Sequence, residues 1–317
     1  MRILAFNVQP YEEKAFVKWA KDNDIEVVLD KDLITPETIE RAKGFDGVTT
    51  QQVIPVKDEA VFDKLKEFGI KQIASRTAGV DMFGLDMARE REIAITNVPR
   101  YSPNAIAELA VSHTMQLLRN VNRIRNAMSK GDFSWNKELI SREIRSCTVG
   151  IIGTGKIGLT TAQLFKGLGA KIIGYDKFRN PDAEGVLEYK DTVEELLKES
   201  DVVSLHLPLN DETYHLIDKE KIDMMKKGAI LINTGRGALV NIEDVIDALE
   251  SGKLSGAGID VLEDEPPIHS NPLIGLKNCL VTPHIAWMPI EARAKVIQIC
   301  RDNLESFLKG EKTNRIV

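Results

Sequence analysis

Short apolar runs alternate with longer amphipathic stretches through the first hundred residues. The runs are rich in β-branched residues, which is typical of buried strands, and the stretches between them have the spacing of helices. A chain that alternates strands with helices in this way predicts βαβ units on a parallel sheet. The expected strands are Ile3 to Phe6, Glu26 to Leu29, Gly47 to Thr50, Ile73 to Ser75 and Ile93 to Asn97.

A long helical pattern separates these runs from a second series. It opens at Ser102-Pro103 and continues towards Met128, before Gly131, which predicts one helix long enough to bridge two domains. Six buried-strand runs follow, and such a series is typical of a doubly wound dinucleotide-binding domain. These runs are Val149 to Ile152, Ile172 to Tyr175, Val202 to Leu207, Ala229 to Ile232, Ala257 to Val261 and Leu280 to Thr282.

The last amphipathic stretch, from about Ile290 to Leu308, has no strand after it. We therefore expect this helix to fold back on the first domain. The predicted fold is α/β, with two Rossmann-like or flavodoxin-like parallel-sheet domains, one inserted into the other. The expected boundaries are residues 1–101 plus 292–317 for the discontinuous outer domain and residues 102–291 for the inserted domain. Two connections make a natural hinge, which suits a cleft that closes over a substrate.

Length and charge narrow the function. With 317 residues, of which 43% are apolar, the chain can form two domains that each bury a core. The net charge is −6 and acidic and basic residues are mixed along the sequence, so no basic stripe indicates nucleic acid and no basic cluster indicates a membrane surface. A small-molecule partner is therefore expected. No apolar stretch approaches the ~20 residues of a membrane-spanning helix, and the N-terminal run predicts a strand rather than a signal peptide.

The cysteines support the same class of protein. Cys147, Cys279 and Cys300 lie in apolar surroundings without C-x-x-C spacing. They fit small buried side chains better than disulfides or a metal site. We therefore expect a cytoplasmic protein without a metal.

A glycine pattern follows the first strand of the second series. The run ending at Ile152 leads directly into Gly153-Thr154-Gly155-Lys156-Ile157-Gly158, which opens a helical stretch. In such a strand–turn–helix context, the first glycine allows a tight turn, the second lets the backbone approach a pyrophosphate, and the third lets the helix pack against the strand. The unpaired N–H groups of the helix N-terminus attract phosphate oxygens. The predicted phosphate-binding residues are Gly153, Gly155, Lys156, Ile157 and Gly158.

An acidic residue ends the next expected strand. Asp176 lies eighteen positions after Gly158, where its carboxylate can accept hydrogen bonds from both hydroxyls of an adenosine ribose and repel the 2′-phosphate of NADP. NAD is therefore the expected cofactor, although the neighbouring Lys177 and Arg179 argue against an absolute preference. A glycine turn that serves packing only, or that binds another nucleotide such as S-adenosylmethionine, is the alternative.

Three polar residues follow three of the later expected strands. Arg236 lies in a Gly-rich turn, Glu265 in an acidic loop, and His284 directly after Thr282-Pro283. Alone, each has a structural explanation as a solvated arginine, an exposed acidic loop or a packing histidine. Because α/β folds bind ligands beyond the carboxyl ends of their strands, their joint placement indicates one site.

The residue types suit reduction of a carbonyl group. Arg236 offers a planar, permanently charged fork that can hold the carboxylate of a 2-keto acid and polarise its C2 oxygen. His284 can donate a proton to that oxygen while a nicotinamide delivers hydride, and Glu265 can orient the imidazole and favour its protonated form.

These motifs together resemble the NAD-dependent D-2-hydroxyacid dehydrogenase family over nearly the whole chain. The motifs that carry the resemblance are Gly153 to Gly158, Asn233-Thr234-Gly235-Arg236-Gly237, Gly258-Ile259-Asp260-Val261 through Glu265-Pro266, and Thr282-Pro283-His284-Ile285-Ala286. The resemblance implies that Arg236, Glu265 and His284 are catalytic, that the outer domain binds substrate, and that the inserted domain binds NAD.

The resemblance also implies roles for further residues. Asp176 would bind the adenosine ribose, and Arg76-Thr77-Ala78-Gly79-Val80-Asp81 matches the loop whose backbone N–H groups bind the substrate carboxylate, through Ala78 and Gly79. The remaining implied cofactor contacts are His206 and Pro208, which would line the cofactor cleft, and Thr234 and Asp260, which would lie beside the nicotinamide.

Two features point to different branches of the family. Tyr101 resembles the D-lactate dehydrogenase branch, where a tyrosine at this point contacts substrate; a hinge tyrosine that only packs is the alternative. Only eighteen residues separate Glu265 from His284, and Ala286-Trp287-Met288 replaces the aromatic pair typical of that branch. The stretch from His284 to Trp287 instead resembles glycerate dehydrogenases, which reduce hydroxypyruvate.

The predicted function is NADH-dependent reduction of a 2-keto acid, with pyruvate favoured, to the D-2-hydroxy acid. A hydroxypyruvate or glyoxylate reductase is the enzymatic alternative, and a non-catalytic NAD(H)-sensing protein resembling corepressors is the alternative from another class. The resemblance further implies a homodimer, formed through the long helix after Pro103.

Overall fold

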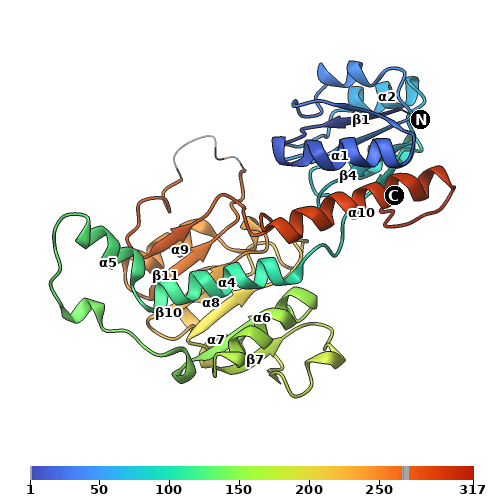
Figure 1. Cartoon of the computed structure of the whole chain (residues 1–317). Helices are drawn as coiled ribbons and strands as arrows, with labels where there is room; N and C mark the ends of the chain where they lie inside the picture. The colour runs from blue at the N-terminus through green and yellow to red at the C-terminus, as the bar shows by residue number, and fades with distance from the viewer. Residues whose placement is uncertain (1, 266, 268–270) are drawn as a thin grey trace. The chain divides into compact units, whose positions relative to one another are not determined.

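The computed structural model describes residues 2–265, 267 and 271–317, so that Pro266 of the expected acidic-loop motif lies outside the described residues. The chain divides into two compact units, each built on one parallel β-sheet (Figure 1). Unit 1 is discontinuous and comprises Met1–Ser102 and Pro289–Val317, and unit 2 comprises Pro103–Met288. The predicted fold class, two parallel-sheet α/β domains, is confirmed.

Unit 1 contains a five-stranded sheet in the order β2-β1-β3-β4-β5. All neighbouring strands are parallel, as the alternating pattern predicts. The predicted strands are confirmed, although the last is shorter by one residue at each end. The strands are β1 (Arg2–Phe6), β2 (Glu26–Leu29), β3 (Gly47–Thr50), β4 (Gln72–Ser75) and β5 (Ala94–Thr96).

Helices cover both faces of this sheet because successive strand side chains point to opposite sides. Ile3 and Ala5 of β1 pack with α1 and α10, whereas Leu4 and Phe6 pack with α2 and α3. The C-terminal helix therefore folds onto the first sheet, as predicted. The helices of unit 1 are α1 (Pro10–Asp22), α2 (Glu59–Glu67), α3 (Leu85–Glu90), α10 (Ile290–Leu308) and the 3₁₀ turn η1 (Thr38–Ala42).

Unit 2 contains a seven-stranded parallel sheet in the order β12-β11-β10-β9-β6-β7-β8. Six strands were expected. The additional one, β8, has two residues, which is too short for any hydrophobic period to reveal it. The run expected to continue to Leu207 ends at Leu205. The strands are β6 (Thr148–Ile152), β7 (Lys171–Tyr175), β8 (Glu188–Tyr189), β9 (Val202–Leu205), β10 (Ala229–Asn233), β11 (Leu254–Ile259) and β12 (Cys279–Val281).

The strand order of unit 2 reverses between β6 and β9, at the switch point where doubly wound folds bind ligands. The apolar clusters place α4 and α6 on one face of the sheet and α7, α8 and α9 on the other. Among the described residues, no helix combines the length and apolar character needed to cross a membrane. The helices of unit 2 are α4 (Pro103–Leu118), α5 (Val121–Met128), α6 (Lys156–Gly167), α7 (Val193–Glu199), α8 (Lys219–Met224), α9 (Ile242–Glu250) and the 3₁₀ turns η2 (Lys137–Leu139), η3 (Ile144–Ser146), η4 (Pro181–Ala183) and η5 (Gly237–Leu239).

The prediction of one long helix from Pro103 towards Met128 is wrong. Helix α4 ends at Leu118, and Asn120 adopts a left-handed backbone with φ of 53° before α5 begins. Asparagine tolerates this conformation better than most residues, so it redirects the chain without a glycine or proline to signal the break.

Candidate functional site

His284 and Glu265 form a hydrogen-bonded pair beyond the carboxyl ends of β11 and β12. Nδ1 of His284 lies 2.5 Å from Oε2 of Glu265, and the other oxygen of Glu265 accepts the Leu262 N–H at 2.6 Å. His284 itself has a left-handed backbone with φ of 53°, and its N–H donates to the Asp260 carbonyl at 2.8 Å. The pair fixes one ring nitrogen, while Nε2 makes no hydrogen bond within the described residues. That nitrogen is the one available for proton transfer.

A buried carboxylate holds the loop that carries His284. Asp260, only 1% exposed, accepts the Thr282 hydroxyl at 2.5 Å and the N–H groups of Ile285 and Ala286 at 3.0 Å each. These bonds lie on both sides of His284 in the chain and therefore fix its position. A role of Asp260 towards the nicotinamide stays a prediction.

Arg236 lies in a turn that is held by two hydrogen bonds to the side chain of Asn233, the last residue of β10. The Asn233 amide donates to the Arg236 carbonyl at 2.8 Å, and its oxygen accepts the Gly235 N–H at 3.1 Å. The next residue, Gly237, lies so close to Leu262 that an added Cβ would come within 2.0 Å of the Leu262 carbonyl carbon. The Arg236 turn therefore abuts the Glu265 loop, and the three predicted catalytic residues follow three adjacent strands, β10, β11 and β12.

The glycine loop lies at the switch point of the unit 2 sheet. Gly153 has a positive φ of 92°, and a Cβ there would lie 2.5 Å from the His206 carbonyl oxygen, beyond the end of β9. A Cβ on Gly158 would lie 1.8 Å from the Gly153 oxygen, so only glycine permits this packing of α6. Gly155, by contrast, has no heavy atom within 4 Å of its Cβ direction. The start of α6, at Lys156 and Ile157, thus has open space beside it for a phosphate.

Asp176 is tied to the glycine loop. One carboxylate oxygen accepts the Thr154 N–H at 2.6 Å, and the other accepts the Phe178 N–H at 3.0 Å. The first of these oxygens also accepts the Thr154 hydroxyl at 3.3 Å, so the oxygen that accepts the Phe178 N–H is the one that retains capacity for a ribose hydroxyl.

The two cations beside Asp176 have acidic partners. Lys177 lies 2.8 Å from a carboxylate oxygen of Glu212, and Arg179 lies 2.6 Å from one of Asp191. Their charges are therefore partly compensated, which weakens any attraction for a 2′-phosphate.

Two residues that support this loop were missed by the sequence analysis. The Tyr189 hydroxyl lies 2.7 Å from the Thr154 hydroxyl and accepts the Asn180 N–H at 2.8 Å. The Asn180 side chain donates to the Thr154 carbonyl at 2.9 Å. Tyr189 belongs to the two-residue strand β8, so no sequence pattern placed it beside the glycine loop.

Two buried polar atoms without hydrogen-bond partners in the described part of the chain lie just beyond the carboxyl ends of β9 and β10 in the unit 2 sheet. Among the described residues, the Thr234 hydroxyl and Nδ1 of His206 are buried without a hydrogen bond. His206 pairs through Nε2 with the Ser204 hydroxyl at 2.9 Å, and burial of the ring lowers its pKa to about 3. Buried polar groups normally find partners, so these atoms fit a polar ligand bound at this edge, as NAD would be. Pro208, which follows, is exposed.

The predicted carboxylate-binding loop lies in unit 1, at the end of β4. Three successive carbonyls of this loop point inward: Thr77 accepts the Val98 N–H at 2.9 Å, Ala78 the Asn97 side chain at 2.7 Å, and Gly79 the Thr77 hydroxyl at 2.6 Å. The N–H groups of Ala78 and Gly79 have no hydrogen-bond partner among the described residues. Adjacent free N–H groups form an anion-binding concavity.

Tyr101 lies near the end of the first segment of unit 1, Met1–Ser102. Its partly buried side chain packs against the apolar cluster that α1 and α10 form with the sheet. A contact with substrate stays a prediction.

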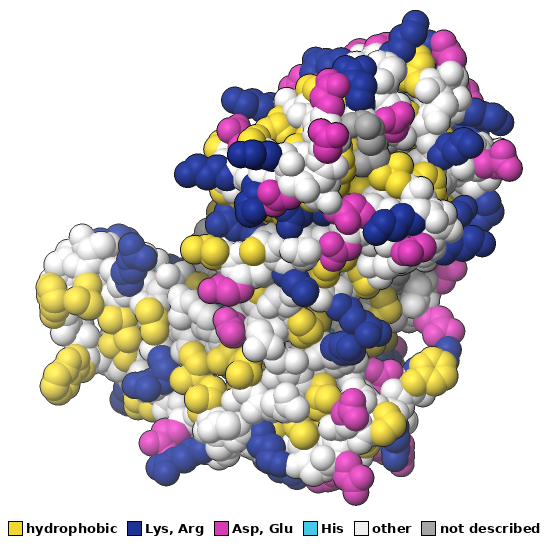
Figure 2. Space-filling view, turned by 45° about the vertical axis from the view of Figure 1, so that its right-hand side comes forward, with side chains coloured by type: hydrophobic (Ala, Val, Ile, Leu, Met, Phe, Trp, Pro, Cys, Tyr) yellow, Lys and Arg dark blue, Asp and Glu magenta, His cyan; other side chains and the backbone are white. Residues whose placement is uncertain are grey.

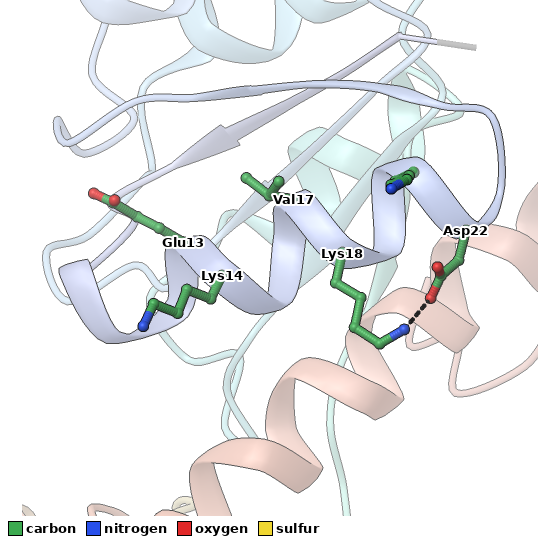
Figure 3. Close-up of a pocket in the computed structure, with 6 residues that line it drawn as sticks. Glu13, Lys14, Val17, Lys18 and Asp22 are labelled. Carbon is green, nitrogen blue, oxygen red and sulfur yellow. Dashed lines mark hydrogen bonds and ion pairs between the residues drawn. The ribbon is translucent and has the colours of Figure 1, made fainter.

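The outer face of α1 holds a shallow, open depression that contains none of the predicted site residues (Figure 3). Glu13, Lys14 and Val17 line it, together with Lys18 and Asp22, which form an ion pair at 2.6 Å. Four of these five side chains are charged, and all but the partly buried Glu13 are exposed, which is typical of a solvated helix surface.

Comparisons with known proteins agree with the geometry. A family model described as "D-isomer specific 2-hydroxyacid dehydrogenase, NAD binding domain" matches residues 111–286. Similar proteins include a D-2-hydroxyacid dehydrogenase (NAD(+)) from Clostridioides difficile, 42% identical over 333 aligned positions, and a D-lactate dehydrogenase from Streptococcus pyogenes serotype M1, 43% identical over 330; both alignments cover 100% of each chain. The solved structure of a D-2-hydroxyisocaproate dehydrogenase matches with a TM-score of 0.91 at 35% identity, covering 100% of this chain and 99% of the other.

Proposed function

Since the chain belongs to the D-isomer specific 2-hydroxyacid dehydrogenase family, we propose that it reduces a 2-keto acid, preferably pyruvate, to the D-2-hydroxy acid with NADH. The observation that carries the proposal is the Glu265–His284 pair beside the Arg236 turn, at the ends of adjacent strands. NADH, when bound, supplies the hydride that reduces the C2 carbon.

The cofactor would be held by unit 2. The open start of α6 after Gly155 suits the pyrophosphate, and the remaining acceptor capacity of Asp176 suits the adenosine ribose. The unpartnered hydroxyl of Thr234 and Nδ1 of His206 suit polar groups at the nicotinamide end.

Proton transfer is assigned to Nε2 of His284. Glu265 holds Nδ1, which leaves the opposite nitrogen available for proton transfer. His284 then protonates the C2 oxygen during reduction and takes the proton back during oxidation. Arg236 binds the carboxylate and polarises the C2 carbonyl, because a guanidinium keeps its charge throughout the reaction.

Carboxylate binding also involves unit 1 in this proposal. The free N–H groups of Ala78 and Gly79 can donate to carboxylate oxygens, and Tyr101 would contact the substrate side chain. This part of the proposal rests on the family resemblance and on the inward-facing carbonyls of the loop.

A substrate panel tests the function. NADH oxidation is followed at 340 nm with pyruvate, hydroxypyruvate, phenylpyruvate and 2-ketoisocaproate, and kcat/KM is measured for each. We expect the highest kcat/KM with pyruvate. A clear lead for hydroxypyruvate would instead establish the glycerate dehydrogenase alternative, since the 3-hydroxyl would then have a polar partner in the site. No turnover of any of the four, together with tight NADH binding, would favour the non-catalytic NAD(H)-sensing alternative.

We further propose that the chain forms a homodimer through the α5 region. Helix α5 has an apolar face but no buried residue, and large apolar side chains are exposed along it and the following loop. Figure 2 shows hydrophobic side chains gathered over the projecting part of unit 2 that holds α5. The exposed fractions are 44% for Val121 and Met128, 69% for Phe133, 97% for Trp135 and 78% for Ile140.

Sedimentation equilibrium tests the dimer. Trp135→Asp should shift the protein towards monomer, because a charge in the patch cannot be buried without a partner. Ile290→Asp, at an apolar position in unit 1 that is 72% exposed, serves as the control and should leave the mass unchanged. A wild-type monomer at micromolar concentration would refute the assembly.

A cytoplasmic location is proposed from the cysteines. Cys147, Cys279 and Cys300 are all free and buried, which suits a reducing compartment. Fractionation of the source cells, with the activity assayed in each fraction, tests this location.

A further inference from the structure

Three asparagines form a hydrogen-bonded chain that ends at the loop of Ala78 and Gly79. The Asn314 side chain donates to the Asn303 side-chain oxygen at 2.8 Å, and the Asn303 amide donates to the Asn97 carbonyl at 2.7 Å. The Asn97 amide then donates to the Ala78 carbonyl at 2.7 Å. Asn303 is fully buried and Asn97 is 8% exposed, so water does not compete freely for these bonds.

The chain joins distant parts of the sequence within unit 1. Asn97 follows β5, Asn303 lies on α10, and Asn314 lies in the C-terminal tail. The tail runs beside β5, where the Asn97 N–H donates to the Asn314 carbonyl at 3.1 Å and the Ile316 N–H to the Ile95 carbonyl at 2.8 Å. The C-terminal tail therefore supports Asn97 in two ways, through the side chain of Asn303 and by a direct bond to the Asn97 N–H.

The bond from Asn97 has a geometric consequence for its neighbour. In a trans peptide group, the C=O and the following N–H point in opposite directions. Because Asn97 holds the Ala78 carbonyl inward, it turns the Gly79 N–H outward. The Val98 N–H has the corresponding effect on the Ala78 N–H by holding the Thr77 carbonyl.

We propose that Asn97, supported by Asn303 and Asn314, is a positioning residue that aims the Gly79 N–H at the substrate carboxylate. This inference rests on the proposed function, since it assigns that loop to the carboxylate of a 2-keto acid. It makes the C-terminal tail part of the substrate-binding apparatus without any contact to substrate.

The test compares Asn97→Ala and Asn97→Asp with wild type. Loss of the donor should raise KM for pyruvate about tenfold in Asn97→Ala, because one aimed hydrogen bond to a charged group is lost. Asn97→Asp should raise it further, on the order of tenfold to hundredfold, because a carboxylate cannot donate and repels both the Ala78 carbonyl and an anionic substrate. In both, kcat should stay within about threefold of wild type, and the Kd for NADH should not change.

Two further variants separate positioning from general stability. Asn314→Gly removes the far donor while keeping a residue suited to the φ of 50° there, and should raise KM by about twofold. Glu305→Ala removes a different tether of α10, the bond that the Trp19 indole donates at 2.7 Å, and should leave KM unchanged at a comparable loss of melting temperature. If Asn97→Ala fails to fold, the Asn314→Gly and Glu305→Ala pair still decides the question.

Unchanged KM in Asn97→Ala and Asn97→Asp, or an equal rise of KM in Glu305→Ala, would overturn the inference. Wild-type protein without activity on any 2-keto acid would instead overturn the proposed function, so the two failures are distinguishable. Inhibition by oxamate, a pyruvate analogue, gives an independent readout and should weaken in parallel with KM.

Discussion

The carboxyl ends of the two sheets present different chemical groups. In unit 2, the proposed acid His284 and its partner Glu265 are side chains, with exposures of 45% and 31%. In unit 1, the polar side chains at the sheet edge are buried and the free groups are backbone N–H donors. Exposed side chains contribute little to folding stability. The direction of a backbone N–H, by contrast, depends on the buried hydrogen bonds that hold its peptide group. Substitutions at the sheet edge of unit 2 should therefore change activity without changing the free energy of unfolding, whereas those in unit 1 should change both.

The switch points of the two sheets differ in the same way. In unit 2, the switch point between β6 and β9 holds a glycine loop with open space at Gly155. In unit 1, the order reverses between β1 and β3, and the Arg76 guanidinium lies at the ends of these two strands. Its guanidinium, fully buried, donates to the carbonyls of Phe6 and Asn7 at 2.9 Å each and pairs with Glu12 at 3.2 Å. Gly155 thus has open space beside it at the switch point of unit 2, whereas a buried cation lies at the switch point of unit 1.

The largest expected effect is loss of turnover without loss of fold, in His284→Gln. Glutamine cannot transfer a proton, so kcat should fall on the order of 10²- to 10⁴-fold. Because the ring is exposed and makes one side-chain bond, the unfolding free energy should change by less than about 1 kcal/mol. Stopped-flow turnover, NADH titration and urea unfolding measure the three quantities. Near-normal turnover would remove His284 from the role of acid.

Glu12→Ala should have the opposite effect, a loss of stability that does not come from a loss of turnover. Removal of this carboxylate leaves the Arg76 guanidinium buried with only neutral acceptors, which costs about 3–5 kcal/mol of unfolding free energy. The Gln9 N–H, which donates to Glu12 at 2.9 Å, also loses its acceptor at the start of α1. Urea unfolding measures the loss, and Glu13→Ala, at the neighbouring and only partly buried position of the same helix, is the control. A cost similar to that of Glu13→Ala would show that the buried pair is not essential to unit 1.

The next effect concerns cofactor choice at the open switch point. Asp176→Ala removes the proposed acceptor for the ribose hydroxyls and the charge that would repel a 2′-phosphate, so the preference for NADH over NADPH should narrow by about ten- to a hundredfold. It also frees the Thr154 N–H, so the Kd for NADH should rise. The ratio of kcat/KM for the two cofactors measures the change. An unchanged ratio would place the selectivity elsewhere, for example in the Lys177–Glu212 pair.

The sequence predicted the strands of both sheets other than β8 and the placement of Glu265 and His284 after strand ends, because buried strands and glycine turns have local signatures. That these residues are catalytic stays a prediction. The sequence could not predict β8, whose two residues show no period, or the break at Asn120, whose side chain is compatible with a helix. The support networks were also invisible. The bonds from Asn303 to Asn97 and from Arg76 to Glu12 join residues far apart in the sequence, and buried polar residues look like exposed ones in a sequence. The Glu265–His284 pair was predictable only because each residue follows a recognisable strand.

The smallest expected effect is a pH dependence of stability that arises in unit 2, where all five histidines lie. Burial lowers the pKa of His206 from 6.5 to about 3, so between these values the unfolded chain binds a proton that the folded chain does not. Acidification therefore favours unfolding, and stability should fall by about 1–2 kcal/mol between pH 7 and pH 5. His206→Gln should abolish this part of the dependence, whereas Glu12→Ala in unit 1, which has no histidine, should leave it unchanged. Urea unfolding of the three proteins at both pH values measures it, and an equal fall in His206→Gln would show that His206 is not the group that senses pH.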